Sequence, residues 1–299
     1  MGVSVRAMRT DTTTRSGVPG LDGSAVTLPV TVWSPDEGTP VVADVLLVHG
    51  YGEHSGRYAP VAEVLCARGL RVTTWDQRGH GRSTGVRKGD VDDMERFLDD
   101  AEAVLADARS ELPCFVYGHS MGGLITVRLA ERLAAKGALD LAGLVVASAA
   151  LAPADSIPTY LVSVANVIGK LTPGLRTIAL DGDAISRDEA VRRDYDADPL
   201  NFRGKLTART GREMNVAMGV ALREAGSITC PVLIVHGGAD QLTAPVGSER
   251  LAEVIGARDC TLRIWDGAYH ELHHEPERDE VLDTIADWVL ERAQPKGSR

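Results

Sequence analysis

Long apolar runs are missing from this chain of 299 residues. No segment reaches the roughly 18 consecutive apolar residues that a membrane-spanning helix needs. The first residues, MGVSVRAMRTDTTTR, contain no apolar centre of a secretory signal. The chain begins Met1-Gly2, but Arg6 breaks the myristoylation pattern. We therefore expect a protein without a membrane span, a leader or a lipid anchor.

Cysteine and positive charge are also scarce. The sequence has four cysteines, far apart and without C-x-x-C spacing: Cys66, Cys114, Cys230 and Cys260. This pattern predicts free thiols in a reducing compartment, so we expect a cytoplasmic protein. Lysine and arginine number 32 against 42 acidic residues, a net charge of −10, and no basic stripe occurs. That balance argues against nucleic-acid partners and against electrostatic docking on anionic membranes.

Short β-rich runs alternate with helical patterns along most of the chain. The strand candidates are 26–33, 45–50, 71–76, 114–120, 143–149, 231–240 and 261–267. The helix candidates are 57–68, 92–109, 121–135, 246–255 and 277–292. Several strand candidates are continuously apolar, as in strands buried on both faces. The alternation predicts βαβ units and an α/β fold with a mostly parallel central sheet flanked by helices.

One segment interrupts this alternation. Between Leu151 and Gly226 there is no strand pattern, and helical patterns are broken by prolines and glycines. We therefore predict a core in two parts, 1–150 and 227–299, with a helical cap at 151–226 inserted between two core strands. Within the cap, 157–171 is mostly apolar with one narrow polar stripe. Such a helix covers a core, lines a pocket or touches lipid.

The segment GHSMGG matches G-x-S-x-G through Gly118, Ser120 and Gly122. The pattern alone is common, but here it follows an apolar strand candidate directly and precedes a helix candidate. A serine at a sharp strand-to-helix turn is the nucleophile elbow of serine hydrolases. The flanking glycines leave room for the tight turn. We predict Ser120 as the nucleophile rather than a residue of an ordinary glycine-rich turn.

A serine hydroxyl needs a base, and the base needs an orienting acid. In α/β-hydrolases the acid and the histidine follow the serine in that order. Asp240 ends a strand candidate, and His270 follows the next one. Asp266 lies four residues before His270 and is the competing acid, although Asp266 with Gly267 is also typical of a turn. We predict Ser120, Asp240 and His270 as the catalytic set.

Two backbone N–H groups must stabilise the oxyanion of such a site. One belongs to the residue after the nucleophile, Met121. The other is predicted at Tyr51, in the loop HGYGEHSGRY that follows a strand candidate. A dinucleotide loop is the rival interpretation, but G-x-G-x-x-G fails because Gly56 falls one place late.

A second motif points to different chemistry. His270, Glu271 and His274 spell H-E-x-x-H, the zinc-binding pattern of metalloproteases. That pattern needs both histidines on one face of a helix and a third ligand. Here a turn precedes His270, and Pro276 closely follows His274. We therefore expect no metal and no other cofactor, and we assign His274 to the surface.

Taken together, several segments resemble the monoacylglycerol lipases of the α/β-hydrolase superfamily, in particular the bacterial members. The resemblance covers residues 25–292, and it is carried by HGYGEHSGRY, WDQRGHGRSTG, GHSMGG, YDADPL, HGGADQLTAPVGS and GAYHELHHEPE. It implies a hydrolase core with a mobile cap, acyl transfer to serine, and a single-chain glycerol ester as substrate.

The resemblance also implies residues that bind the glycerol end. The matching positions are Glu53, Arg57 and His273, although Glu53 and Arg57 could instead pair with each other. Tyr195 matches a cap motif and is counted with them. Mammalian members carry a cysteine where this chain has Thr243, so their thiol sensitivity does not carry over.

The leading prediction is therefore a serine esterase that hydrolyses monoacylglycerols. The alternatives are a lysophospholipase or a broad carboxylesterase and, from another class, a non-catalytic ligand-binding module. The expected partner is a small lipid ester, with transient contact of the cap to a lipid surface through apolar side chains.

Overall fold

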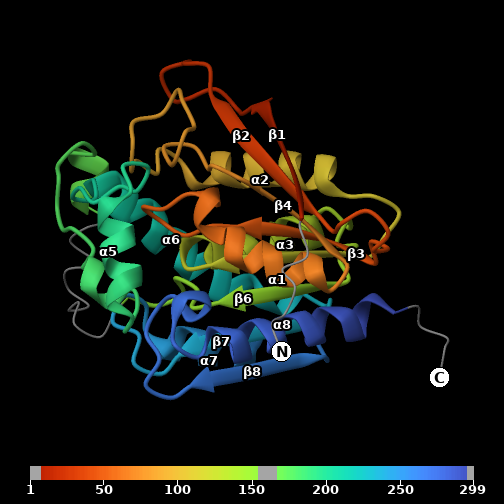
Figure 1. Ribbon diagram of the computed structural model, residues 1–299. Coiled ribbons are helices and arrows are strands. Elements are labelled where there is room, and N and C mark those ends of the chain that lie inside the picture. Colours follow the sequence, from red (N-terminus) through yellow and green to blue (C-terminus); the bar gives the residue numbers. More distant parts are fainter. Residues whose placement is uncertain (1–7, 154–166, 295–299) are drawn as a thin grey trace.

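Eight strands form one sheet in the order β1-β2-β4-β3-β5-β6-β7-β8 in the computed structural model, which describes residues 8–153 and 167–294 (Figure 1). The strands are β1 (Arg9–Ser16), β2 (Thr27–Ser34), β3 (Ala43–Val48), β4 (Leu70–Trp75), β5 (Cys114–His119), β6 (Gly143–Ala147), β7 (Val232–Gly237) and β8 (Cys260–Trp265). Strand β2 is antiparallel to both of its neighbours, and every other neighbouring pair is parallel. The predicted α/β-hydrolase architecture is confirmed.

The central strands are apolar on both sides because helices cover both faces of the sheet. All six residues of β3 are buried. Leu46 and Val48 belong to one apolar cluster, and Val45 and Leu47 belong to the other. This alternation follows from the two-residue period of a strand. It explains why the buried strands read as continuous apolar runs instead of alternating ones.

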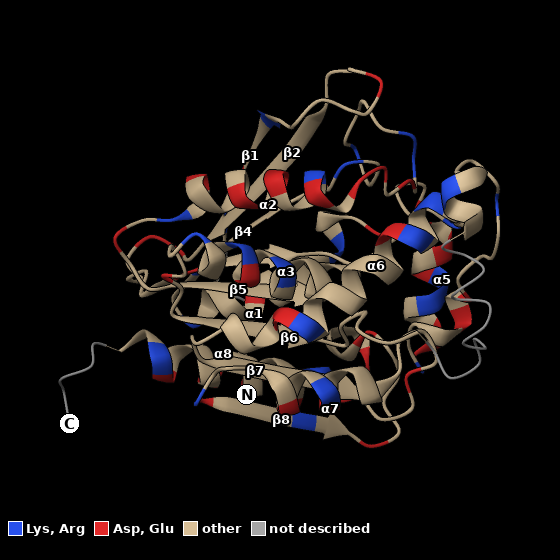
Figure 2. Ribbon diagram, turned by 180° about the vertical axis from the view of Figure 1, so that it is seen from behind, with Lys and Arg blue, Asp and Glu red and all other residues tan. Residues whose placement is uncertain are grey.

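Helices cover the two faces of the sheet (Figure 1). One face packs against α2 (Met94–Ala108), α3 (Met121–Ala135) and α7 (Pro245–Val254), and the other packs against α1 (Ala59–Ala67) and α8 (Arg278–Ala293). Helix α6 (Ala208–Glu224) packs on α2, α3 and α7. Prolines open α1 and α7, where the missing N–H costs nothing. Charged residues of both signs lie on α2 and α5 (Glu189–Ala197), while the inner strands carry few (Figure 2).

Strand β1 was not predicted. Its sequence, RTDTTTRS, is polar throughout, and nearly all of its residues are exposed. It lies at the edge of the sheet and pairs with β2 along its whole length, from Arg9 opposite Ser34 to Ser16 opposite Thr27. An edge strand that buries neither face is held by backbone hydrogen bonds, which leave no apolar pattern in the sequence.

The segment between β6 and β7 supplies helices instead of strands. Its described part contains the short 3-10 helix η2 (Gly182–Ala184), α5 and α6, and isolated bridges are its only β-pairings. Of the apolar stretch predicted at 157–171, residues up to 166 lie outside the description, and the remaining five are helical. Among the described residues, no helix combines the length and the apolar character that crossing a membrane would require.

Candidate active site

Ser120 occupies a strained turn between β5 and α3. Its φ of 53° and ψ of −119° fall outside the usual regions for a residue with a Cβ. The neighbouring glycines are required by packing. A Cβ at Gly118 would lie 2.2 Å from the carbonyl oxygen of Gly122, and a Cβ at Gly122 would lie 2.0 Å from that of Val48. The strand, turn and helix predicted around Ser120 are therefore present.

Asp240 and His270 come together from the loops after β7 and β8. Asp240 Oδ2 lies 2.7 Å from His270 Nδ1. A carboxylate only accepts hydrogen bonds, so Nδ1 carries the proton and Nε2 is left free as a base. The competing acid, Asp266, is exposed beside Gly267, whose φ is 72°. The structure thus brings Asp240 to the histidine and leaves Asp266 in the turn.

The two partners shift each other's pKa in opposite directions. Burial alone would raise the pKa of Asp240, but the charge of His270 and hydrogen bonds from His236 and His270 outweigh it and hold that pKa far below its usual range. Burial would lower the pKa of His270, but the charge and hydrogen bond of Asp240 raise it above its ordinary value. An ionised Asp240 therefore strengthens His270 as a base.

The loop after β3 passes directly against Ser120. A Cβ at Gly50 would lie 3.2 Å from the Ser120 Cβ. The backbone N–H groups of Tyr51 and Met121 make no hydrogen bond to another described residue. Unpaired N–H groups in a buried site are uncommon. These two donors are available for a ligand oxygen beside Ser120.

Glu53 holds the shape of that loop. Its Oε1 accepts hydrogen bonds from the Gly50 N–H, at 2.5 Å, and from the Tyr58 hydroxyl, at 2.7 Å. Its Oε2 accepts from Arg57 Nη1 at 2.7 Å. The simple pairing of Glu53 with Arg57 that the sequence left open is therefore present. Glu53 lines the cavity above Ser120, whereas Arg57 is not among the described residues that line it.

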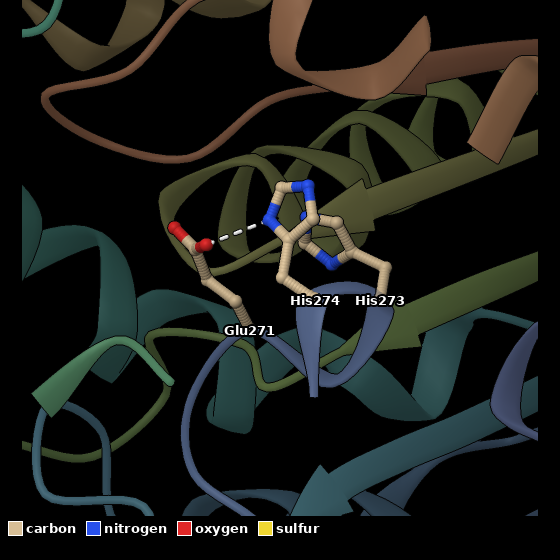
Figure 3. Close-up of side chains that lie close together, drawn as sticks. All are labelled: Glu271, His273 and His274. Atoms are coloured by element: carbon tan, nitrogen blue, oxygen red, sulfur yellow. Dashed lines mark hydrogen bonds and ion pairs between the residues drawn. The ribbon is translucent and has the colours of Figure 1, made fainter. Parts of the chain in front are cut away.

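The two histidines after Glu271 have little exposed surface. His274 is not at the surface, because its Nδ1 lies 2.8 Å from Glu271 Oε2 and its side chain is only 11% exposed (Figure 3). His273 is buried and stacks on Tyr58, with ring centroids 4.8 Å apart. It is absent from the described lining of the cavity, so its contact with the substrate's alcohol stays a prediction.

Glu271, His273 and His274 lie close enough for their ligand atoms to fall within 4.8 Å of one another (Figure 3). The donor set does not fit a cation, because Arg57 binds both oxygens of Glu271, at 2.6 and 2.7 Å. A metal ion there would face a guanidinium. The two histidines of H-E-x-x-H have different partners, since His270 binds Asp240. The motif also lies outside an α-helix, because only the 3-10 helix η4 (Leu272–His274) follows His270.

A cavity of about 690 Å³ opens above Ser120 and His270. Its walls are mostly apolar and come from the core and from the described part of the cap: Ala150, Ala152, Ile168, Ile178, Leu180, Ile185, Phe202, Leu206, Met214, Met218 and Leu242. Four carboxylates and one guanidinium also line it: Glu53, Asp181, Asp196, Glu271 and Arg203. The volume lies within the range of roughly 300–1,000 Å³ that is usual for small-molecule sites.

The segment between β6 and β7, which the sequence predicts as a cap, contacts both loops of the site. Tyr195 lines the cavity, and its ring lies under the Arg57 guanidinium, 4.8 Å from it. His54 Nε2 lies 2.9 Å from Asp198 Oδ2. The N–H of Glu271 donates to the Ile185 carbonyl at 2.8 Å. The segment between β6 and β7 therefore contacts the loops that carry Tyr51 and His270.

Sequence reasoning missed two contributors to the site. From the sequence, Glu271 is placed only in the H-E-x-x-H motif. Its position next to His270 also indicates that it lies in the site. Thr243 was noted only as a replacement for cysteine, yet its hydroxyl lies 2.9 Å from Asp240 Oδ2. Hydroxyl contacts of this kind leave no periodic pattern in a sequence.

A serine at a strained elbow, a buried Asp–His pair and a sheet with one antiparallel strand among parallel ones define an α/β-hydrolase of the serine type. Comparison with known proteins gives the same class. The chain belongs to the Hydrolase_4 family, described as serine aminopeptidase, S33, whose profile matches residues 39–277.

Individual relatives make the placement more specific. A monoacylglycerol lipase of Mycolicibacterium smegmatis is 38% identical over 263 residues, which are 87% of this chain and 91% of that protein. The human monoglyceride lipase is 35% identical over 272 residues, 89% of this chain and 88% of the relative. The crystal structure of a monoacylglycerol lipase from Paleococcus ferrophilus superposes with a TM-score of 0.76 at 31% identity, covering 96% of this chain and 99% of the other. The resemblance seen in the sequence is thus confirmed.

Proposed function

We propose that this protein hydrolyses monoacylglycerols to glycerol and a free fatty acid through an acyl intermediate on Ser120. The observation that carries the proposal is that Ser120 and His270 both line a largely apolar cavity while His270 Nδ1 binds Asp240. The names of the relatives give the same substrate class.

In the first half of the reaction, His270 Nε2 takes the proton of the Ser120 hydroxyl while Oγ attacks the ester carbonyl carbon. The negative charge that develops on the carbonyl oxygen is stabilised by the N–H groups of Tyr51 and Met121. When the tetrahedral intermediate collapses, the C–O bond to glycerol breaks. The glycerol oxygen then receives the proton from His270.

In the second half, water replaces glycerol. His270 removes a proton from the water as its oxygen attacks the acyl carbon, and the bond to Ser120 Oγ breaks. The proton returns to Ser120, and the fatty acid leaves. Throughout, Asp240 accepts the Nδ1–H of His270 and stabilises its charged form.

The lining of the cavity favours an uncharged head group. Carboxylates outnumber guanidinium groups there, with Arg203 the one cation among the described lining residues. The guanidinium of Arg57 is bound by Glu53 and Glu271 instead of facing the cavity. A phosphate would meet net negative charge, so glycerol esters fit better than lysophospholipids.

Contact with a lipid surface is part of the proposal. Large apolar side chains are exposed on the described cap beside the cavity: Val167, Leu171, Leu175, Ile178 and Leu180. Two of them, Ile178 and Leu180, also line the cavity. A patch of this kind beside the entrance would let an acyl chain pass from an aggregate without full exposure to water.

A hydrolysis panel tests the proposal. Monoacylglycerols, diacylglycerols and lysophosphatidylcholines of graded and matched chain length are compared, together with labelling by a fluorophosphonate probe. We expect the monoacylglycerols to have the highest kcat/KM and the labelling to vanish in Ser120→Ala. Faster hydrolysis of lysophosphatidylcholine would replace the substrate assignment with the phospholipid alternative. Labelling that persists in Ser120→Ala would overturn the nucleophile.

A further inference from the structure

The side chain of His236 lies beneath the Asp240–His270 pair. It belongs to β7 and is fully buried, with an exposure of 0%. Its Nδ1 lies 2.7 Å from the hydroxyl of Ser248, on α7. Its Nε2 lies 3.1 Å from Asp240 Oδ2, and it lies 3.2 Å from the carbonyl oxygen and 3.3 Å from the hydroxyl of Thr243. The ring thus connects helix α7 to the carboxylate that binds His270.

These neighbours determine where the ring carries a proton. A carboxylate and a backbone carbonyl can only accept, and both lie next to Nε2 of His236. Nε2 must therefore be protonated: its N–H donates to the Thr243 carbonyl oxygen, and Asp240 Oδ2 lies 3.1 Å from the same nitrogen. The Ser248 hydroxyl can either donate or accept, so it satisfies Nδ1 in either state. His236 thus keeps a protonated nitrogen 3.1 Å from Asp240 Oδ2, whichever role the Ser248 hydroxyl takes.

The two oxygens of the Asp240 carboxylate have different partners. Its Oδ1 accepts from the N–H groups of Leu242, at 2.8 Å, and Thr243, at 3.0 Å. Its Oδ2 has His270 at 2.7 Å and the Thr243 hydroxyl at 2.9 Å. That hydroxyl has one proton and also lies 3.1 Å from the carbonyl oxygen of Ser148. When it donates to Ser148, the nitrogens of His236, at 3.1 Å, and of His270, at 2.7 Å, are the two that remain next to Oδ2.

We propose that His236 is a positioning residue that holds Oδ2 of Asp240 at the point from which it orients His270. It is not catalytic, because it is fully buried and is absent from the described lining of the cavity. Ser248 in turn holds the ring of His236. The proposal rests on the function proposed above, with Asp240 as the acid of the catalytic set.

The test compares variants that remove the N–H with one that keeps it. His236→Leu removes the Nε2–H group. His236→Gln retains an N–H group at a similar distance from the backbone, and Ser248→Ala removes the hydroxyl that binds Nδ1 of the ring. We expect His236→Leu to lower kcat roughly tenfold to a hundredfold, as for a lost hydrogen bond to a charged group, with KM within about twofold. His236→Gln should recover most of kcat, and Ser248→Ala should lie between the two.

A double-mutant cycle separates this inference from the proposed function. In an Asp240→Asn background, His236→Leu should cause no further loss, because its effect passes through Asp240. An equal loss in both backgrounds would overturn the positioning role. Full activity of Asp240→Asn itself would instead overturn the proposed catalytic set.

Protein NMR tests the positioning role in variants that keep the fold. The His270 Nδ1–H proton should give a far-downfield resonance in the wild type that moves in Ser248→Ala and His236→Gln, both of which change polar contacts without emptying the core. If His236→Leu folds and keeps wild-type kcat, or if the resonance is unmoved in the two polar variants, His236 has no positioning role.

Discussion

Arg57 and Glu271 form a bidentate ion pair. Arg57 Nη1 lies 2.6 Å from Oε1, and Nη2 lies 2.7 Å from Oε2. The same Nη1 also binds Glu53, and the Tyr195 ring lies beneath the guanidinium. Arg57 therefore joins the loop that carries Tyr51, the loop that carries His270, and the cap.

Replacing Arg57 should destabilise the protein strongly. Arg57→Leu leaves two buried carboxylates without their cation, and removing one partner of a buried ion pair costs about 3–5 kcal/mol. Arg57→Lys should recover only part of this, because an ammonium cannot bind two carboxylates in the same planar geometry. Urea unfolding measures the difference.

Arg68 provides the matched control. It pairs with Asp283 and Asp287, whose side chains are 62% and 69% exposed. Such surface pairs contribute about 0–1 kcal/mol, so Arg68→Leu should change stability little. Equal losses in Arg57→Leu and Arg68→Leu would contradict the role assigned to the buried network.

Asp240→Asn should lower kcat by up to ~10⁴-fold, because an amide can place its N–H toward His270 and force the wrong tautomer. Asp266→Asn is the control and should retain wild-type kcat, since Asp266 lies exposed in the turn. Steady-state kinetics on a soluble ester checks both. The reverse ranking would move the acid to Asp266.

The pH dependence follows from the raised pKa of His270. The base must be neutral to accept the serine proton, and it is protonated below its pKa. Because Asp240 raises that pKa, kcat/KM should fall on the acid side with a midpoint above the ordinary histidine value of about 6.5. In Asp240→Asn the residual activity should have a lower midpoint. A wild-type midpoint below 6.5, measured with a substrate that does not ionise, would contradict this.

The turn at Ser120 should not tolerate a methyl group. In Gly122→Ala the new Cβ would lie 2.0 Å from the Val48 carbonyl oxygen, so the elbow must move. We expect lower thermal stability and loss of activity. Gly219→Ala, in α6, meets nothing within 4 Å and should instead stabilise by up to about 1 kcal/mol through helix propensity. Calorimetry and activity of the two variants provide the comparison.

The exposed cap patch should matter only for aggregated substrate. Leu171→Ser and Leu175→Ser should reduce activity on emulsified monoacylglycerol and leave hydrolysis of a monomeric ester unchanged, because both side chains are more than half exposed. Val254→Ser, on α7, is the control, since Val254 is 43% exposed and is absent from the described lining of the cavity. Equal activity of all variants on emulsions would remove the lipid-surface proposal.

Much of the fold could be predicted from the sequence because the patterns that indicate strands and turns are local. The central strands were predicted within a few residues since burial on both faces leaves continuous apolar runs. The elbow was recognisable because G-x-S-x-G lies between a strand and a helix. β1 was missed because an exposed edge strand needs no apolar side chains. Residues up to 166 of the predicted apolar cap helix lie outside the described chain, so that prediction is tested only at 167–171, which are helical.

The positions of charged and polar partners were less predictable. Arg57 was expected at the substrate, but its guanidinium is bound by Glu271, 214 positions away in the chain. His274 was expected at the surface and instead binds Glu271. Such pairs form between loops that only the folded sheet brings together, and their spacing in the sequence has no period.

By itself, the sequence determined the α/β architecture, the nucleophile candidate and the order of its partners, because strand burial and tight turns constrain neighbouring residues. The tertiary structure decided which acid meets His270, which carboxylates hold Arg57, and that His236 contacts Asp240 from below. Those choices depend on distances between side chains from separate loops, which are set when β7 and β8 align side by side and their carboxyl ends meet.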